Sequence, residues 1–398
     1  MSGARLLDLT RSLRRAGRVA TGVDRVERAY LAQFLKDDVD CFALFRTAFG
    51  YVLLDRSGMQ AFRACLEGSA DWSAADILSR LPRGRDQVLS QAETDIRKRA
   101  VARCVPSRLR QMLSRHLPEG YEYYNIGHSN LTERVLRCVG YAGGEVHVMV
   151  HDVIPLEFPQ FQRPGTVRPF EDKMKRVSRM AARVIYNSDD TRSRAEALMQ
   201  TWGRVPPSIV AHLGTIEPVV DATELPDILP PDGPYFVTIG TIEPRKNHAF
   251  LLDLWDELGP GAPPLLICGS RGWNNDAVFD RLDVLPPTGP VVELNGLSDG
   301  AVGALVQGSA GVLFPSLAEG FGLPPVEALS LGARVLCNDL PVLQEILGDA
   351  PSFVSVFDRE NWLVKVRSWE NSPPDADRPS GFDPSNWTDH FKTVLRLP

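Results

Sequence analysis

The sequence lacks several features that would each have placed the protein in a special class. No apolar run approaches the roughly 18 residues that a membrane-spanning helix needs, and Arg5, Asp8 and Arg11 interrupt the apolar residues near the start, so no signal-peptide core is expected. Six scattered cysteines show no paired metal spacing, which favours reduced, buried thiols. Basic residues are not in excess either: 44 Lys and Arg against 50 Asp and Glu argue against nucleic acid as the main partner. We therefore expect a cytoplasmic protein, with peripheral contact at the inner face of the membrane as an alternative.

What is present fits a two-domain α/β protein. The length of 398 residues and the 43% hydrophobic content suffice for two cores. Residues 221–234 hold four prolines and a glycine, a composition typical of a linker. We predict a first domain over residues 1–225, joined by a C-terminal helix over 385–398. A linker over 226–234 and a second domain over 235–384 follow.

Buried strands that lead into polar loops organise both halves. Val146–Val150, with one histidine, and Leu265–Gly269 are largely apolar runs, as expected for strands of a parallel sheet covered on both faces. Ligands of such sheets bind beyond the carboxyl ends of the strands. His128 and His151 both follow predicted strands, and His151 is the better candidate for a functional histidine.

The most informative stretch runs from Gly311 to Ala350. A short apolar strand leads into a loop with Glu319 and two glycines, and Pro324 and Pro325 then predict the start of a helix, with Glu327 in its first turn. Free N–H groups at such a helix start attract an anion such as phosphate. The flanking carboxylates are better suited to hydroxyl groups. Phosphate and hydroxyls together indicate a nucleotide sugar.

A pair of cations lies in a comparable place near the start of the second domain. The strand Tyr235–Gly240 is followed by Arg245 and Lys246. Just past the carboxyl end of a strand, an arginine and a lysine can clamp a diphosphate.

The string EGFGLPPVEA, which contains Glu319 and Glu327, resembles the signature of retaining glycosyltransferases of family four, which have the GT-B fold. The loop with Arg245 and Lys246 is similar to that family's phosphate loop. TGVDRVER, at residues 21–28, resembles the family's first cleft loop, and HDVIP, at residues 151–155, resembles its cleft histidine loop.

The resemblance implies two Rossmann-like domains that face each other across a cleft, with the C-terminal helix returning to the first domain. It implies catalytic roles for His151, Arg245, Lys246 and Glu319. It implies that the donor contacts Arg245, Lys246, Glu319, Gly320, Phe321, Gly322, Leu323 and Glu327. It also places Gly22, Val23 and Asp152 on the cleft or acceptor side.

No D-x-D string stands in a plausible loop to hold Mg²⁺, and Asp189-Asp190 is expected to begin a helix instead. We therefore expect no metal and no cofactor, with the cations and helix amides stabilising the leaving phosphate. The expected activity is hexosyl transfer from a nucleoside-diphosphate sugar to a saccharide or lipid-linked saccharide. The product would be a surface polysaccharide or glycolipid, with mannosyl or rhamnosyl transfer suggested by the first-domain strings.

Other interpretations stay open at this point. A nucleotide-sugar epimerase or an inactive sugar-binding protein could use the same GT-B fold. Residues 71–117 are expected to be largely helical, and Arg97–Arg115 hold seven Lys and Arg without an acid. A solvated helical face explains that segment, and contact with anionic lipid is the alternative.

Overall fold

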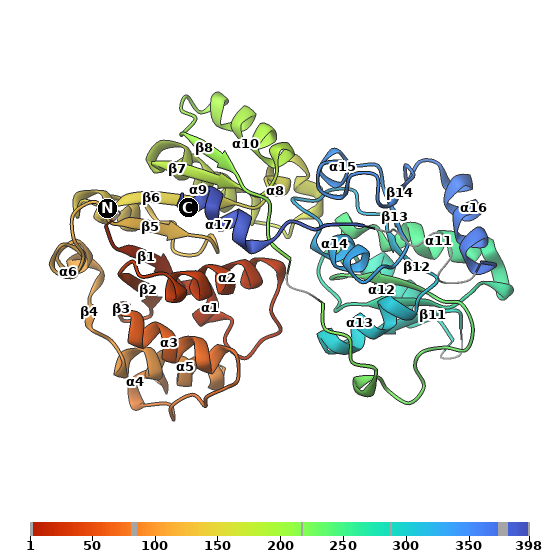
Figure 1. The fold of residues 1–398 in the computed structure, drawn as a ribbon, viewed down its shortest axis with the longest axis horizontal. Coiled ribbons are helices and arrows are strands. Elements are labelled where there is room, and N and C mark those ends of the chain that lie inside the picture. The colour runs from red at the N-terminus through yellow and green to blue at the C-terminus, as the bar shows by residue number, and fades with distance from the viewer. Residues whose placement is uncertain (1–2, 81–85, 216–217, 287–288, 373–380, 397–398) are drawn as a thin grey trace.

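The computed structural model describes residues 3–80, 86–215, 218–286, 289–372 and 381–396. Each half of the chain is built around its own sheet, and the two halves form two lobes side by side (Figure 1). Two Rossmann-like sheets confirm the predicted α/β class. In both sheets the strands are mostly parallel and buried, as their continuous apolar sequences predicted.

The first sheet has the strand order β4-β3-β2-β1-β5-β6-β7-β8. Its pairs are parallel except β2 with β3 and β3 with β4, which are antiparallel. Its strands are β1 (Arg5–Asp8), β2 (Cys41–Thr47), β3 (Gly50–Leu54), β4 (Ala102–Cys104), β5 (Glu122–Asn125), β6 (Glu145–Val150), β7 (Arg183–Tyr186) and β8 (Ser208–Val210). The helices of this half are α1 (Thr10–Arg14), α2 (Gly22–Lys36), α3 (Arg56–Leu66), α4 (Ile77–Arg80), α5 (Gln87–Lys98), α6 (Leu109–His116), α7 (Glu133–Tyr141), α8 (Ile154–Glu157), α9 (Val167–Met180) and α10 (Asp189–Thr201), with 3₁₀ turns at Pro106–Arg108 and Pro159–Phe161.

The second sheet has the order β11-β10-β9-β12-β13-β14, with parallel pairing between its strands. Its strands are β9 (Phe236–Ile239), β10 (Leu265–Cys268), β11 (Val291–Leu294), β12 (Gly311–Phe314), β13 (Val335–Cys337) and β14 (Ser352–Phe353). The helices that follow the first domain's last strand are α11 (His248–Leu258), α12 (Asp276–Asp283), α13 (Asp299–Gly308), α14 (Leu323–Ser330), α15 (Pro341–Leu347), α16 (Arg359–Glu370) and α17 (Trp387–Leu395), with 3₁₀ turns at Ala222–Glu224, Pro244–Lys246 and Gly259–Gly261.

The C-terminal helix α17 returns to the first lobe, as predicted (Figure 1). The hydroxyl of Tyr30 on α2 lies 2.9 Å from His390 Nε2, and its ring packs edge-on against Phe391, with centroids 5.0 Å apart. The other ring nitrogen of His390 lies 2.9 Å from the carbonyl oxygen of His212. The helix therefore ties the end of the chain to α2 and to the residues after β8.

The expectation of a largely helical segment over residues 71–117 is wrong at β4. Ala102–Cys104 form an edge strand that pairs with β3. Arg97 is buried, and its guanidinium contacts Asp76 at 2.6 Å, so it is not part of a solvated basic face. No helix of the described residues is both long and apolar enough to cross a bilayer.

Candidate active site

The loop after β9 and the loop after β12 meet at the carboxyl ends of two adjacent strands. The first loop makes a tight path: a Cβ atom at Gly269 would lie 1.9 Å from the carbonyl oxygen of Gly240. It then forms the 3₁₀ turn Pro244–Lys246, whose proline occupies the position that needs no N–H. The backbone N–H of Leu317 donates to the carbonyl of Arg245 at 2.7 Å, which joins the two loops.

These loops bring together four charged side chains, which we call the Glu319 cluster: Glu243, Arg245, Lys246 and Glu319. The Glu319 carboxylate receives Lys246 Nζ at 2.6 Å on one oxygen and an Arg245 guanidinium nitrogen at 2.9 Å on the other. Arg245 Nε also contacts Glu243 at 2.7 Å. Lys246 Nζ lies 4.4 Å from the centroid of the Phe314 ring, a cation–π contact. The predicted cations and the first predicted glutamate are therefore one ion-paired unit.

Burial and charge act in opposite directions on Glu319. Only 5% of the residue is exposed, and that burial by itself raises the pKa of its carboxyl group. Arg245 and Lys246 outweigh the burial and lower the pKa to about 2. Glu319 is therefore ionised at neutral pH and pairs with both cations.

The first lobe covers this cluster with the loop after β6. The backbones approach so closely that a Cβ atom at Gly320 would lie 2.2 Å from the His151 carbonyl oxygen and 2.9 Å from Asp152 Cβ. The hydroxyls of Ser188 and Thr191, at the start of α10, donate to the Gly320 carbonyl at 3.1 Å each. Gly320 is thus at the contact between the two lobes.

His151 lies at the end of β6, as predicted, and its ring is fixed. Nε2 is 2.8 Å from the carbonyl oxygen of Ile126, which can only accept, so Nε2 carries the proton. Burial lowers the pKa of His151 to about 4, which keeps the ring neutral at pH 7. His128 makes the reciprocal contact, 2.6 Å from the Met149 carbonyl oxygen, and the two rings lie 5.4 Å apart. Asp152 is half-buried; burial raises the pKa of its carboxyl group and Arg245 opposes that rise.

The helix α14 begins at Leu323, one residue before the predicted prolines. Gly322 is its N-cap residue and has φ +95, a conformation that glycine adopts without strain. Phe321 is buried and lies edge-on to His212, with ring centroids 6.2 Å apart. The prediction that Glu327 lies in the first turn is wrong, because the helix starts early enough to place it one turn further in.

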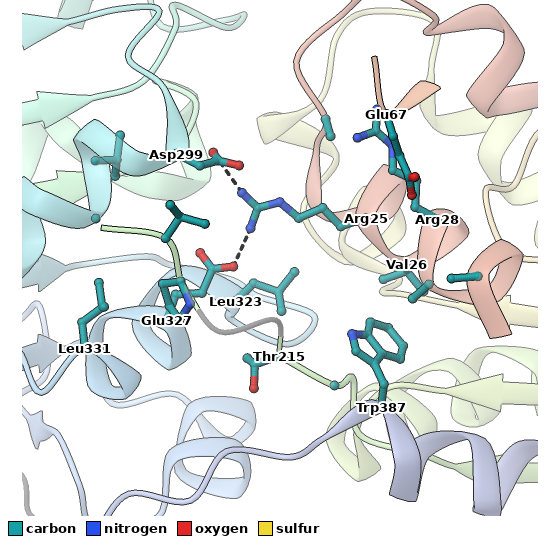
Figure 2. A pocket seen from close by; sticks show the side chains of 18 of the residues that line it. Arg25, Val26, Arg28, Glu67, Thr215, Asp299, Leu323, Glu327, Leu331 and Trp387 are labelled. Atoms are coloured by element: carbon teal, nitrogen blue, oxygen red, sulfur yellow. Dashed lines mark hydrogen bonds and ion pairs between the residues drawn. The ribbon is translucent and has the colours of Figure 1, made fainter. Parts of the chain in front are cut away.

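Glu327 lies apart from the Glu319 cluster, in a cavity of about 800 Å³ between the lobes. This interdomain cavity is bounded by α2, α13, α14, the chain after β8 and α17 (Figure 2). Leu323 and Glu327 line it, whereas Arg245, Lys246 and Glu319 are not among its lining residues. The four charged residues predicted from sequence are therefore divided between two neighbouring environments.

Of the weaker predictions on the first lobe, Gly22 meets the second lobe. A Cβ atom at Gly22 would lie 3.2 Å from a methyl carbon of Leu323, so the start of α2 abuts the start of α14. Val23 follows in the first turn of α2 and is half-buried.

Two contacts between the lobes involve residues that the sequence did not single out. Arg25 on α2 reaches Glu327 at 2.5 Å and Asp299 on α13 at 3.2 Å (Figure 2). Glu345 on α15 accepts from the backbone N–H groups of Asp189 and Asp190 at 2.6 and 2.9 Å, and from His212 at 2.9 Å.

Asp189 and Asp190 begin α10, as predicted. The sequence contains only a weak indication of these contacts. Arg25 belongs to the TGVDRV string and Glu345 to the end of the Gly311–Ala350 stretch, but neither motif indicates which residue it contacts.

Residues 223–380 match the family described as "Glycosyl transferases group 1". This range contains the whole Glu319 cluster together with Glu327.

The chain is similar to curated bacterial mannosyltransferases. It is 30% identical over 251 residues to "Serotype-specific mannosyltransferase WbdA" of Escherichia coli, covering 57% of this chain and 31% of that protein. It is 35% identical over 119 residues to "O-antigen chain mannosyltransferase B" of Escherichia coli, covering 29% of this chain and 31% of that protein. The chain thus spans about a third of the length of these relatives.

Solved structures establish the GT-B fold. The structure titled "Anabaena Alr3699/HepE in complex with UDP-glucose" superposes with a TM-score of 0.62 and 13% identity, covering 98% of this chain and 95% of that one. Sucrose-phosphate synthase from Thermosynechococcus elongatus gives a TM-score of 0.52 and 17% identity over 70% of this chain and 72% of that one. At these identities the likeness concerns the fold alone.

Proposed function

We propose that this protein is a retaining, metal-independent glycosyltransferase. It moves a hexosyl group from a nucleoside-diphosphate sugar to a saccharide or lipid-linked saccharide acceptor. The observation that carries the proposal is the Glu319 cluster: a buried carboxylate gripped by Lys246 and Arg245 beside the start of α14. The match of residues 223–380 to glycosyl transferases group 1 supports it.

The cluster suits the departure of a diphosphate. Lys246 and Arg245 can neutralise the negative charge that grows on the leaving phosphate, and the glycine-capped start of α14 adds backbone N–H groups. Because both cations are already paired with Glu319, a bound diphosphate would share them with that carboxylate. Glu319 keeps lone pairs that can accept from sugar hydroxyls, since an ionised carboxylate has about four acceptor sites.

His151 has a contacting rather than an acid role in this proposal. Its ring is neutral at pH 7 with Nε2–H committed to Ile126, so it cannot supply a proton to the leaving group. Its carbonyl already accepts from Asn187 Nδ2 at 3.0 Å and lies against Gly320. The bond between the anomeric carbon and the phosphate oxygen would break as the acceptor oxygen bonds to that carbon on the same face, which gives retention, and the acceptor's proton would pass to the departing phosphate.

The relatives favour a mannosyl donor and a polysaccharide acceptor, as the names of the mannosyltransferases WbdA and O-antigen chain mannosyltransferase B state for those proteins. We propose the same classes for this chain, in surface polysaccharide or glycolipid synthesis, with the acceptor entering between the lobes near Asp152.

Calorimetric titration with GDP, UDP and ADP, without added metal, tests the donor site. Binding of one of the three is expected, and no binding of any would contradict the proposal. Transfer is then tested with the matching sugar nucleotides and a mannose-containing oligosaccharide. NMR of the product should show the donor's anomeric configuration, whereas an inverted product would contradict retention.

A further inference from the structure

Arg25 joins the two lobes through Glu327, for which the resemblance to family-four glycosyltransferases implies a contact with the donor; the donor's ribose hydroxyls suit it, because an ionised carboxylate accepts hydrogen bonds. It extends from α2 of the first lobe into the interdomain cavity, where its guanidinium contacts Glu327 and Asp299 of the second lobe (Figure 2). Arg25 and Glu327 are half-buried, with 31% and 25% of their side chains exposed. An ion pair in this setting is shielded from water more than a surface pair and is correspondingly harder to break.

A nucleotide sugar and Arg25 compete for the same carboxylate. If the ribose hydroxyls bind Glu327, they replace a charged partner with neutral donors. That exchange is unfavourable unless the guanidinium finds another anion, because Arg25 would keep only Asp299, whose side chain is 75% exposed and therefore a weak partner.

The donor carries such an anion, and Arg25 is close to where it would bind. Gly22, one turn before Arg25 on α2, abuts Leu323 at the start of α14. Glu327 lies about one turn, roughly 6 Å, beyond that start. The Arg25 guanidinium contacts Glu327 in the second turn of α14, the helix at whose start the diphosphate is proposed to bind.

We propose that Arg25 exchanges partners when the donor binds, from the Glu327 carboxylate in the empty enzyme to the diphosphate in the loaded one. The inference rests on the proposed function and adds a first-lobe residue to a donor site otherwise built from the second lobe. The ion pair would then favour charged ligands, because a ligand with a ribose but no phosphate must break the Arg25–Glu327 contact and leaves Arg25 with the exposed Asp299 alone. A nucleoside diphosphate supplies the replacement anion itself.

The exchange predicts effects of opposite sign on two ligands when Arg25 is changed to Gln. The nucleobase is the one whose nucleoside diphosphate binds in the calorimetric titration. The affinities of that diphosphate and of the corresponding uncharged nucleoside are then compared. We expect Arg25→Gln to weaken the diphosphate about tenfold, the size of one charge-assisted hydrogen bond. The same change should tighten the nucleoside, because Glu327 becomes free for the ribose. Weak nucleoside binding is measured by NMR titration and diphosphate binding by calorimetry.

Three further variants sharpen the test. Arg25→Lys keeps the charge but loses the two-pronged geometry, so its two affinities should lie between those of wild type and Arg25→Gln. Glu327→Gln should weaken the nucleoside. Arg179→Gln changes an exposed arginine of α9 that does not line the cavity and should leave both affinities within about twofold, below the effect of a single hydrogen bond. A purely structural Arg25 would weaken both ligands together when replaced, and that outcome overturns the exchange. Unchanged affinities in Arg25→Gln overturn it as well, while failure of the wild type to bind any nucleotide overturns the proposed function with it.

Discussion

The two glutamates of one motif, separated by seven residues, occupy opposite environments. Glu319 is buried between two cations, which lower the pKa of its carboxyl group to about 2. Glu327 lines a cavity; burial raises the pKa of its carboxyl group, and the single cation Arg25 opposes that rise without cancelling it. One carboxylate is fixed in its charged form by the protein, and the other depends on a side chain from the opposite lobe.

The two glutamates of the motif therefore have different tasks in the proposed function. The ion pairs of the Glu319 cluster are formed within the second lobe, although the first-lobe Asp152 also acts on Arg245 electrostatically. The environment of Glu327 changes whenever α2 moves relative to α14. In the proposed function, the charge that stabilises the leaving phosphate would therefore come from the second lobe, whereas nucleoside binding at Glu327 would depend on how the two lobes are placed.

The largest effect should come from removing a cation of the Glu319 cluster. Lys246→Met keeps much of the side-chain length but cannot neutralise the leaving phosphate, and losing one such group typically costs about 10² to 10³ in kcat. Initial-rate measurements with saturating donor check this. Lys392→Met, on the exposed face of α17, is the matched control and should retain full activity. A kcat for Lys246→Met within threefold of wild type would remove the cluster from the chemistry.

A smaller loss is expected from a methyl group at the contact between the lobes. Gly320→Ala would place its Cβ 2.2 Å from the His151 carbonyl oxygen, so the loops must separate. Displacement of reacting groups by about 1 Å can lower turnover about 10²-fold. Transfer activity should fall by that order while nucleotide binding to the second lobe persists. Gly140→Ala, where a Cβ atom meets nothing within 4 Å, should behave as wild type; equal losses in both variants would show that Gly320 has no special place.

Thermal unfolding should distinguish the two glutamates by the direction in which their replacement changes Tm. Because the pKa of Glu319 is lowered, its charge stabilises the fold above pH 4.5, its unfolded value, and that contribution is lost as pH falls toward 2. Glu319→Gln should lower Tm by about 5 °C at pH 7, as expected when a buried ion pair loses one partner. The gap from wild type should narrow below pH 4.5.

The pKa of Glu327 is raised, so its ionised form destabilises the folded state at pH 7. Protonation removes this destabilisation as pH falls. Glu327→Gln should therefore leave Tm unchanged or raise it at pH 7, and converge with wild type in acid. Differential scanning calorimetry from pH 7 to pH 3 measures both variants. Parallel curves for the two would contradict the contrast between their environments.

Much of the fold could be predicted because buried parallel strands can be recognised in the sequence as short apolar runs. Leu265–Cys268 is apolar throughout and Val146–Val150 is apolar except for His147; polar loops follow both, and both are strands. β4 (Ala102–Cys104) escaped because it is a three-residue edge strand whose side chains are only partly buried, including an exposed Arg103. Its strand conformation comes from pairing with β3, a partner that a local pattern does not contain.

The site was predictable in so far as its members stand close together in a motif. Glu319 and Gly322 belong to one loop, and Lys246 was recognised by its place after a strand. The contact of Arg25 with Glu327 spans 302 positions along the chain, and Glu345 meets Asp190 across 155. Such pairs depend on how two lobes dock, a tertiary property that neither composition nor spacing encodes.

The smallest expected effect is that of removing metal ions, which tests whether the Glu319 cluster alone supplies the positive charge. If Lys246 and Arg245 supply the positive charge for the leaving diphosphate, exhaustive treatment with EDTA should change kcat by less than about twofold, since the cations are part of the chain. Initial rates before and after chelation, and with Mg²⁺ or Mn²⁺ restored, measure this. In Lys246→Met, added Mg²⁺ or Mn²⁺ should restore little activity. Glu319 remains paired with Arg245, and the Glu319 cluster has no third carboxylate beside Glu243 and Glu319 to complete a cation site. Loss of activity on chelation and its return with Mg²⁺ would mean that the cluster alone does not neutralise the leaving group.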